Sequence, residues 1–185
     1  MKAPVHVSLI WSRIEWRPSD TWKKNVLPRL LKHKIDEAKL NRSVYVIRLA
    51  GEFAVDYPKG QSPAVYIGEG NFNARINAHK NWVLELKNLA GDFALEVCVA
   101  TPRVKKSELA YRDCEAALID RFAEIYGSAP LWNKQYESRL CPHYEYSHKK
   151  MDEALRRRSG SRYLWSVKPM PSSSFYEDFQ RTHRA

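Results

Sequence analysis

The chain has 185 residues, 44% of them apolar, which suits one compact domain and, since no run of about 18 apolar residues occurs, excludes a membrane-spanning helix. Its three cysteines form no CxxC pair, which argues against a disulfide framework or a zinc knuckle and for a reducing, cytoplasmic compartment. With 31 Lys and Arg against 21 Asp and Glu, the formal net charge of +10 favours a polyanionic partner: nucleic acid first, with an anionic membrane or an acidic protein as alternatives.

Predicted strands and helices alternate along the chain. A strand is expected over 4–12, and a helix follows that Asp20 or Asn25 could cap and that ends near Leu40. The elements expected after it are strands at 43–53 and 64–68, a helix at 72–89, a strand at 93–101, a helix at 107–126 and a short helix at 148–158. Beyond 158, prolines and serines predict a loosely held tail.

The helix expected over 72–89 carries two polar residues on or beside its inward face. Ile76, His79 and Val83 recur at helical spacing, and Arg75 lies four residues before His79 at the edge of the same stripe. Taken singly, an edge arginine is usually a surface residue and an inward histidine is usually part of a core. They become functional candidates only together with other polar groups.

The helix expected over 107–126 carries a carboxylate close to its core face. Its apolar stripe runs through Tyr111, Cys114 and Leu118, and Glu115 falls at the border of that stripe. A carboxylate at such a border is costly unless a cation or a hydrogen-bond donor meets it, and the ordinary partner is a lysine or an arginine.

Together with Tyr66 on the preceding strand, these polar residues suit phosphate chemistry. Arginine binds a phosphate through two nitrogens, a carboxylate holds Mg²⁺, and a phenol or an imidazole can move a proton. A Tyr, an Arg, a His and a Glu on one small sheet therefore predict a site that acts on phosphates.

In this arrangement the chain resembles the GIY-YIG nuclease superfamily. The motifs that carry the resemblance follow the family's order over roughly half of the chain: Ser43-Val44-Tyr45, Tyr66-Ile67-Gly68, Arg75, His79, Glu115 in "CEAALIDRF" and Asn133 in "PLWNK". The chain departs from the family pattern where Ser43 replaces a glycine and where Glu69 stands in place of a frequent lysine. A long insertion between Tyr45 and Tyr66, together with the "EAALI…PLWN" ending, looks most like the restriction-endonuclease-like branch.

The resemblance implies an α+β, sandwich-like fold with a small central three-stranded sheet flanked by helices. The nuclease-like core would span 43–135, with a strand and helix addition at 1–42 and a basic C-terminal extension at 136–185. These additions would supply further DNA contacts or a dimer surface.

The resemblance also implies a metal-dependent endonuclease that hydrolyses phosphodiester bonds in DNA, with duplex DNA as the expected partner. Glu115 would hold one Mg²⁺ or Mn²⁺ per site, and Arg75 would neutralise charge that develops on the phosphate. Tyr45 would activate the attacking water as a general base.

The remaining residues of the resemblance receive supporting roles. Tyr66 and His79 would position the water or assist the proton transfer, and Asn133 would brace Glu115 or a tyrosine. Each chain would carry one such site, so a double-strand break at a palindromic target favours a homodimer on DNA.

Two alternatives stay open. The chain could be a nuclease that acts on RNA or on single-stranded DNA, or it could be a non-catalytic nucleic-acid-binding module on the same scaffold. The basic residues expected near the site are Lys80, Arg103, Lys105 and Lys106, and the densest basic cluster is Arg156–Arg158 with Arg162. A charge run is often only a solvated face.

Overall fold

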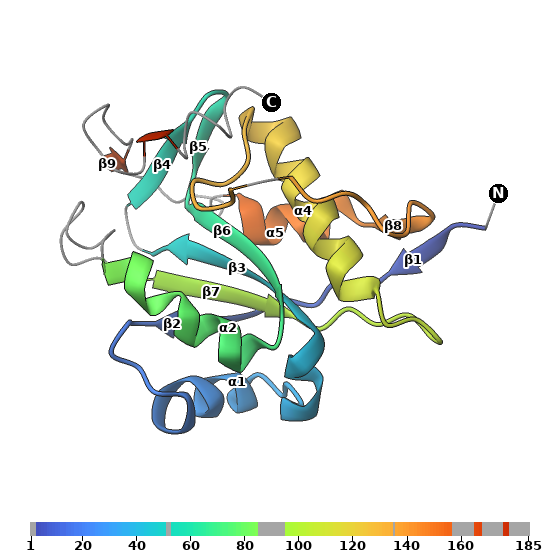
Figure 1. Ribbon diagram of the computed structural model, residues 1–185, viewed down its shortest axis with the longest axis horizontal. Coiled ribbons are helices and arrows are strands. Elements are labelled where there is room, and N and C mark those ends of the chain that lie inside the picture. Colours follow the sequence, from blue (N-terminus) through green and yellow to red (C-terminus); the bar gives the residue numbers. More distant parts are fainter. Residues whose placement is uncertain are drawn as a thin grey trace.

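A four-stranded antiparallel sheet lies at the centre of the protein, and helices pack on it to make an α+β fold (Figure 1). The computed structural model describes residues 3–50, 53–84, 95–134, 136–156, 165–167 and 176–177. The strands of this sheet are β2 (Ser12–Trp16), β3 (Ser43–Leu49), β6 (Ala64–Gly70) and β7 (Leu95–Ala100). Their spatial order is β2-β7-β3-β6, so β7 and β3 are the inner strands.

The central sheet has four strands and corrects the expectation of three. The additional strand is β2, which pairs with β7 along its whole length and buries Trp16 completely. The region of the single strand expected over 4–12 contains β1 (Val5–Val7) and the start of β2. Strand β1 does not join the central sheet but pairs in parallel with β8 (Tyr144–Tyr146). Such a long-range pairing leaves no local sequence pattern, which is why the sequence indicated one strand.

Three short helical pieces replace the helix expected from the Asp20 region to Leu40. They are a π-helical turn (Trp22–Val26), α1 (Leu27–Lys32) and a 3₁₀-helix (Glu37–Arg42). Lys34 follows α1 with a left-handed φ of 58°, which an α-helix cannot continue. Asp36 then begins the 3₁₀-helix, because its side chain accepts a hydrogen bond from the backbone N–H of Ala38.

Helix α2 (Phe72–Ala78) is shorter than the helix expected over 72–89. The Asn71 side chain caps its start by accepting a hydrogen bond from the N–H of Ala74. The helix is interrupted at His79 and helical structure returns at 80–84, while the rest of the expected helix, residues 85–89, lies outside the described residues.

Helix α4 (Ala110–Tyr126) packs against β6 and β3, and α5 (His148–Leu155) packs against α4 (Figure 1). Gly127 ends α4 in a left-handed conformation with φ of 82°, as the sequence indicated. On β3, Tyr45 contacts α2 while Arg48 donates hydrogen bonds to carbonyl oxygens at the end of α5. Alternate strand residues face opposite sides, so α2 and α5 cover opposite faces of the sheet.

The insertion between Tyr45 and Tyr66 folds as a hairpin beside the main sheet. Its strands β4 (Phe53–Tyr57) and β5 (Gly60–Ser62) pair with each other, and β4 also pairs with β9 (Trp165–Val167). The hydroxyl of buried Tyr57 donates to the carbonyl of Ala64 at 2.6 Å and accepts from the N–H of Leu131 at 3.1 Å. None of the helices in the described part of the chain is long and apolar enough to cross a membrane.

Candidate active site

Two tyrosines from neighbouring strands lie on one face of the sheet. In the β3–β6 ladder, Tyr45 is opposite Gly68 and Ile47 is opposite Tyr66, so all four side-chain positions share a face. The two tyrosine rings have centroids 6.0 Å apart. Tyr45 is fully buried, whereas Tyr66 is half-buried and therefore lies nearer the solvent.

Gly68 makes room for both tyrosines. A methyl group built on Gly68 would come within 2.5 Å of Cε1 of Tyr66 and 2.7 Å of the hydroxyl oxygen of Tyr45. Because these are ring and hydroxyl atoms in a packed region, no larger residue fits without moving them. The glycine of the Tyr-Ile-Gly motif is therefore required by packing.

His79 lies between Tyr45 and Trp82, and the indole determines its tautomer. The Nε1–H of Trp82 donates to Nδ1 of His79 at 2.8 Å, so Nδ1 accepts and carries no proton. Burial, together with the charge of Arg75, lowers the pKa of His79 to about 4, so the ring is neutral at pH 7. A neutral ring with a bare Nδ1 carries its proton on Nε2, which lies 2.7 Å from the Tyr45 hydroxyl and donates to it.

Arg75 and Tyr45 act together on the hydroxyl of Tyr66. Nη2 of Arg75 donates to that hydroxyl at 3.0 Å. Burial raises the pKa of Tyr66, but the charge of Arg75 and hydrogen bonds from Arg75 and Tyr45 lower it, and the charge of Glu115 raises it. Burial raises the pKa of Tyr45 as well, and the neighbouring Tyr66 raises it further, although a hydrogen bond from Arg75 and its charge lower it. Of the two phenols, Tyr66 is the less buried, so desolvation opposes its ionisation less.

Glu115 projects from α4 at the border of its core face, where the sequence predicts it. Burial, then the charges of Glu69 and Glu137, raise the pKa of its carboxyl to about 8, although Arg75 and Arg112 act in the opposite direction. The carboxyl lines a pocket of about 280 Å³ formed by Glu69, Arg112, Glu115, Glu137, Ser138 and Leu140. The charge of Glu115 in turn affects both Tyr45 and Tyr66, so these groups belong to one electrostatic site.

Asn133 holds the backbone between Tyr66 and Gly68. Its Oδ1 accepts from the N–H of Ile67 at 2.9 Å, and its Nδ2 donates to the carbonyl of Ile67 at 2.8 Å. The next strand of a sheet would make the same pair of bonds, so this buried side chain replaces a missing neighbour on the outer side of β6. The partner of Asn133 is thus a backbone group between the site residues and not the side chain of Glu115 or a tyrosine.

The residues at this site fit a divalent cation only in a sparse ligand set. The described residues hold no group of three or more His, Cys, Asp or Glu side chains arranged to bind a metal. Mg²⁺ commonly takes one or two carboxylates and completes its shell with water and substrate phosphate. The negative charges of Glu69 and Glu137 disfavour ionisation of Glu115. A bound cation would offset this repulsion.

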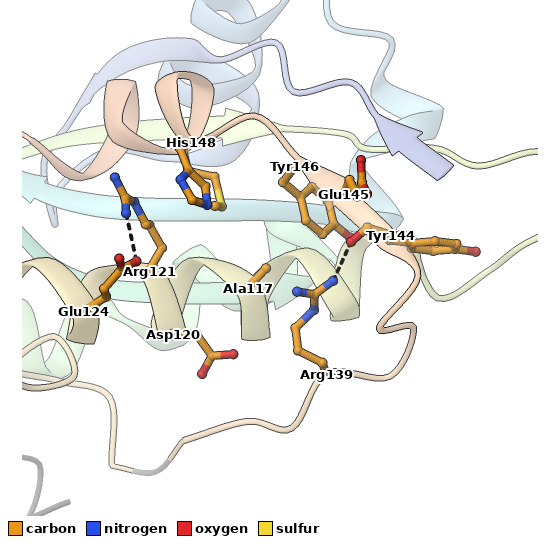
Figure 2. Close-up of a pocket in the computed structure, with 10 residues that line it drawn as sticks. Ala117, Asp120, Arg121, Glu124, Arg139, Tyr144, Glu145, Tyr146 and His148 are labelled. Carbon is orange, nitrogen blue, oxygen red and sulfur yellow. Dashed lines mark hydrogen bonds and ion pairs between the residues drawn. The ribbon is translucent and has the colours of Figure 1, made fainter. Parts of the chain in front are cut away.

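A larger pocket of about 440 Å³ lies on another side of α4, and the two arginines that line it, Arg121 and Arg139, are already paired (Figure 2). Figure 2 shows Arg121 paired with Glu124 and Arg139 bonded to Tyr144. Arg139 also pairs at 2.9 Å with Asp113, which is completely buried. The Arg139–Asp113 pair fastens the segment after Asn133 onto α4, so the pocket lies at a structural junction.

The sequence did not indicate that Trp82 belongs to the site. It also suggested basic residues near the site as free to bind a substrate, although several of them are bonded within the protein. Trp82 stands three residues after His79, a helical spacing that could have indicated their contact. Lys80 donates to the carbonyl of Asp20, and Arg103 donates to the carbonyl of Lys39, so neither side chain is free. Arg156 pairs with Asp152, while Arg157, Arg158 and Arg162 lie outside the described residues.

Comparison of the chain with protein-family models, with curated proteins and with solved structures gave no match. The functional conclusion therefore depends on the geometry of the site.

Proposed function

We propose that the protein is a metal-dependent endonuclease of the GIY-YIG type, which hydrolyses phosphodiester bonds in duplex DNA. The observation that carries the proposal is the directed set of hydrogen bonds that ends on the hydroxyl of Tyr66. Trp82 donates to His79, the Nε2–H of His79 donates to Tyr45, and Tyr66 accepts from Arg75. Tyr45 also lowers the pKa of Tyr66 through a hydrogen bond.

This direction of donation favours proton removal from a tyrosine. Hydrogen bonds donated to a phenol oxygen stabilise its ionised form, and an adjacent guanidinium does so more strongly because it is charged. His79 cannot take the proton of Tyr45 through Nε2, because that nitrogen already carries one. Its role in the proposal is to support the phenolate and not to act as the base.

Tyr66 is the better candidate for the base that activates the attacking water. The sequence expectation gave this role to Tyr45, whose side chain is fully buried and out of reach of water. Tyr66 is half-buried and accepts from the permanent cation Arg75 at 3.0 Å. Tyr45 would then act through Tyr66, as a positioning residue that relays the donation from His79.

Arg75 and Glu115 would act on the phosphate itself. Arg75 is exposed at its α2 position and can contact the non-bridging oxygens while its Nη2 still donates to Tyr66. Glu115 is the residue that would hold a divalent ion, with Glu69 and Glu137 adding negative charge beside it. When bound, Mg²⁺ or Mn²⁺ would supply a Lewis acid for the scissile phosphate and its leaving oxygen.

Plasmid nicking tests the proposal. The protein should nick supercoiled DNA in the presence of Mg²⁺, and Glu115→Gln should abolish nicking while DNA binding remains, because an amide is a much poorer cation ligand. Glu124→Gln, an exposed position on the same helix, is the matched control and should stay active. Full nicking by Glu115→Gln would reject the metal assignment.

Substitution of the two tyrosines separates their roles. Tyr66→Phe should lower kcat more than Tyr45→Phe, and both should leave KM nearly unchanged, because each removes a group used in the transition state. Arg75→Ala should lower kcat at least ~10²-fold, as loss of a single transition-state donor does elsewhere. A stronger effect of Tyr45→Phe would return the base role to Tyr45.

The substrate and the assembly are tested in the same assay. Duplex DNA, single-stranded DNA and RNA offered in parallel would distinguish the proposed substrate from the alternatives, and binding without cleavage of any of them would favour a non-catalytic module. If a homodimer cuts palindromic DNA, supercoiled plasmid should become linear directly and the complex should have the mass of two protomers. Accumulating open circles from a monomer would contradict the dimer.

A further inference from the structure

A lysine turn projects from the loop that links the two halves of the candidate site. Val104 and Ser107 pair as an antiparallel bridge, and Lys105 and Lys106 form the tip between them. Figure 1 shows this loop extending beyond the end of β7 and returning to the first turn of α4.

The ends of the loop connect directly to site elements. Before the loop, Val99 of β7 is the cross-strand partner of Tyr45. After the loop, α4 begins at Ala110 and carries Glu115 in its second turn. The turn therefore stands at the end of the sheet where Tyr45 and Glu115 lie, and a substrate held there would pass close to it.

The base of the turn is firmly attached to the body. The guanidinium of Arg103 donates hydrogen bonds to the carbonyls of Lys39 and Arg42. Glu108 forms an ion pair with Arg42 at 2.7 Å. Val104 packs against the hydrophobic core. Two flanking residues thus fix the turn to the segment immediately before β3, and the tip is held in a defined position.

The tip itself carries two cations that have no partner in the described part of the chain. Lys105 and Lys106 are exposed, and neither side chain makes an ion pair or a hydrogen bond within the described residues. Lys106 has a φ of 60°, at a turn position where glycine is the usual residue. Glycine adopts this left-handed conformation without strain, so Lys106→Gly removes the side chain without disturbing the turn.

We infer that Lys105 and Lys106 form a phosphate-binding tip that contacts the backbone of the duplex next to the cleaved bond. This inference rests on the proposed endonuclease function and adds how the duplex is held. Lysine ammonium groups are flexible point charges, which suit sequence-independent contacts with phosphates and not the reading of bases. The two lysines would raise affinity and take no part in the chemical step.

The test compares two matched double variants, both made in the Glu115→Gln background for binding. The first combines Lys105→Ala with Lys106→Gly, and the control combines Lys32→Ala with Lys34→Gly. Each removes two exposed lysines, and each replaces one lysine of positive φ by glycine, since Lys34 has φ of 58°. Lys32 and Lys34 lie at the end of α1, which packs against β2 at the opposite edge of the sheet from β6.

The readout is the salt dependence of binding to a fluorescent duplex. Loss of two phosphate contacts should reduce the slope of log K against log salt by about 1.8, which is roughly a 12-fold change in relative affinity over a fourfold change in salt. The control should keep the slope of the parent. In the active background, the tip variant should raise KM and leave kcat unchanged, and Lys105→Arg with Lys106→Arg should restore binding.

Melting curves separate a binding effect from unfolding. Because glycine tolerates the left-handed backbone, the tip variant should keep its Tm or gain about 2–4 °C. Equal slopes for the tip variant and the control would overturn the inference while leaving the endonuclease proposal intact, provided that the parent binds and cleaves duplex DNA. A parent protein that neither binds nor cleaves DNA would overturn both.

Discussion

The indole of Trp82 donates a hydrogen bond to Nδ1 of His79 over 2.8 Å and thereby places the imidazole proton opposite the hydroxyl of Tyr45. Indole is a donor only, so its position leaves the neutral imidazole a single tautomer. Trp82 would in this way set the direction of the hydrogen bonds from His79 to Tyr45 and from Tyr45 to Tyr66.

Trp82→Phe should release this control while keeping most of the packing. Without the indole N–H, the proton of His79 can occupy either ring nitrogen, and the donation to Tyr45 becomes intermittent. We expect kcat to fall by about tenfold with little change in KM, an effect of the size of one general acid–base contribution or less. Long-range ¹⁵N NMR of the imidazole should show Nε2 protonated in the wild type and a tautomer mixture in the variant. A single unchanged tautomer in Trp82→Phe would contradict the assignment.

The carboxyl of Glu115 should make the stability of the metal-free protein depend on pH. Its pKa is about 8 in the folded protein against an ordinary value of 4.5, so between these values the folded state binds a proton that the unfolded state lacks. This contribution stabilises the folded state below about pH 4.5 and is lost as the pH rises through about 8.

Thermal unfolding in EDTA at pH 5 and pH 9 measures this effect. The Tm of the wild type relative to Glu115→Gln should fall as the pH rises, and Glu115→Gln should be the more stable protein at pH 9. Other titrating groups, such as His79, contribute to both proteins and cancel in the difference. Parallel Tm profiles would show that the carboxyl is not held protonated.

Asn133→Ala should destabilise the fold by about 1–3 kcal/mol for each buried group left without a partner, because both the N–H and the carbonyl of Ile67 lose their bonds. Urea unfolding gives the free energy, and Asn77→Ala is the control. Among the described residues, the side chain of exposed Asn77 bonds only to Asn73 of its own helix, so its loss should cost less than about 0.5 kcal/mol. Similar costs for the two variants would show that the clamp on β6 is unimportant.

Gly68→Ala should disturb the two tyrosines. The added methyl group would lie 2.5 Å from the Tyr66 ring, and overpacking of this kind typically costs about 1–3 kcal/mol. Because the displaced groups are the proposed base and its donor, nicking should fall by at least about tenfold even where the protein remains folded. Near-UV circular dichroism reports the altered tyrosine environment, and normal nicking with an altered spectrum would separate the packing from the chemistry.

Much of the framework of the site was predictable from local sequence. The run at 64–68 predicted β6, alternating apolar residues predicted β7, and a long apolar stripe with Gly127 after it predicted α4 and its end. The same stripe placed Glu115 at the border of the core. These features depend on neighbours within one element, and the period of a strand or a helix is set by the backbone itself.

The periodic pattern of the sequence could not predict contacts between residues that lie far apart in the chain. The local sequence did not indicate that Asp113 is fully buried, because its neutralising partner Arg139 lies 26 residues away. The entry of β2 into the sheet likewise depends on β7, which follows it by about eighty residues.

By itself, the sequence determined which residue types meet on the sheet: tyrosines on β3 and β6, Arg75 and His79 around α2, and Glu115 on α4. Only the tertiary structure decided that Tyr45 is buried while Tyr66 is accessible, and that Trp82 fixes the proton of His79. The physical reason is that a side chain's periodicity is a property of its own helix or strand. Its exposure, its hydrogen-bond direction and its pKa are properties of what packs against it.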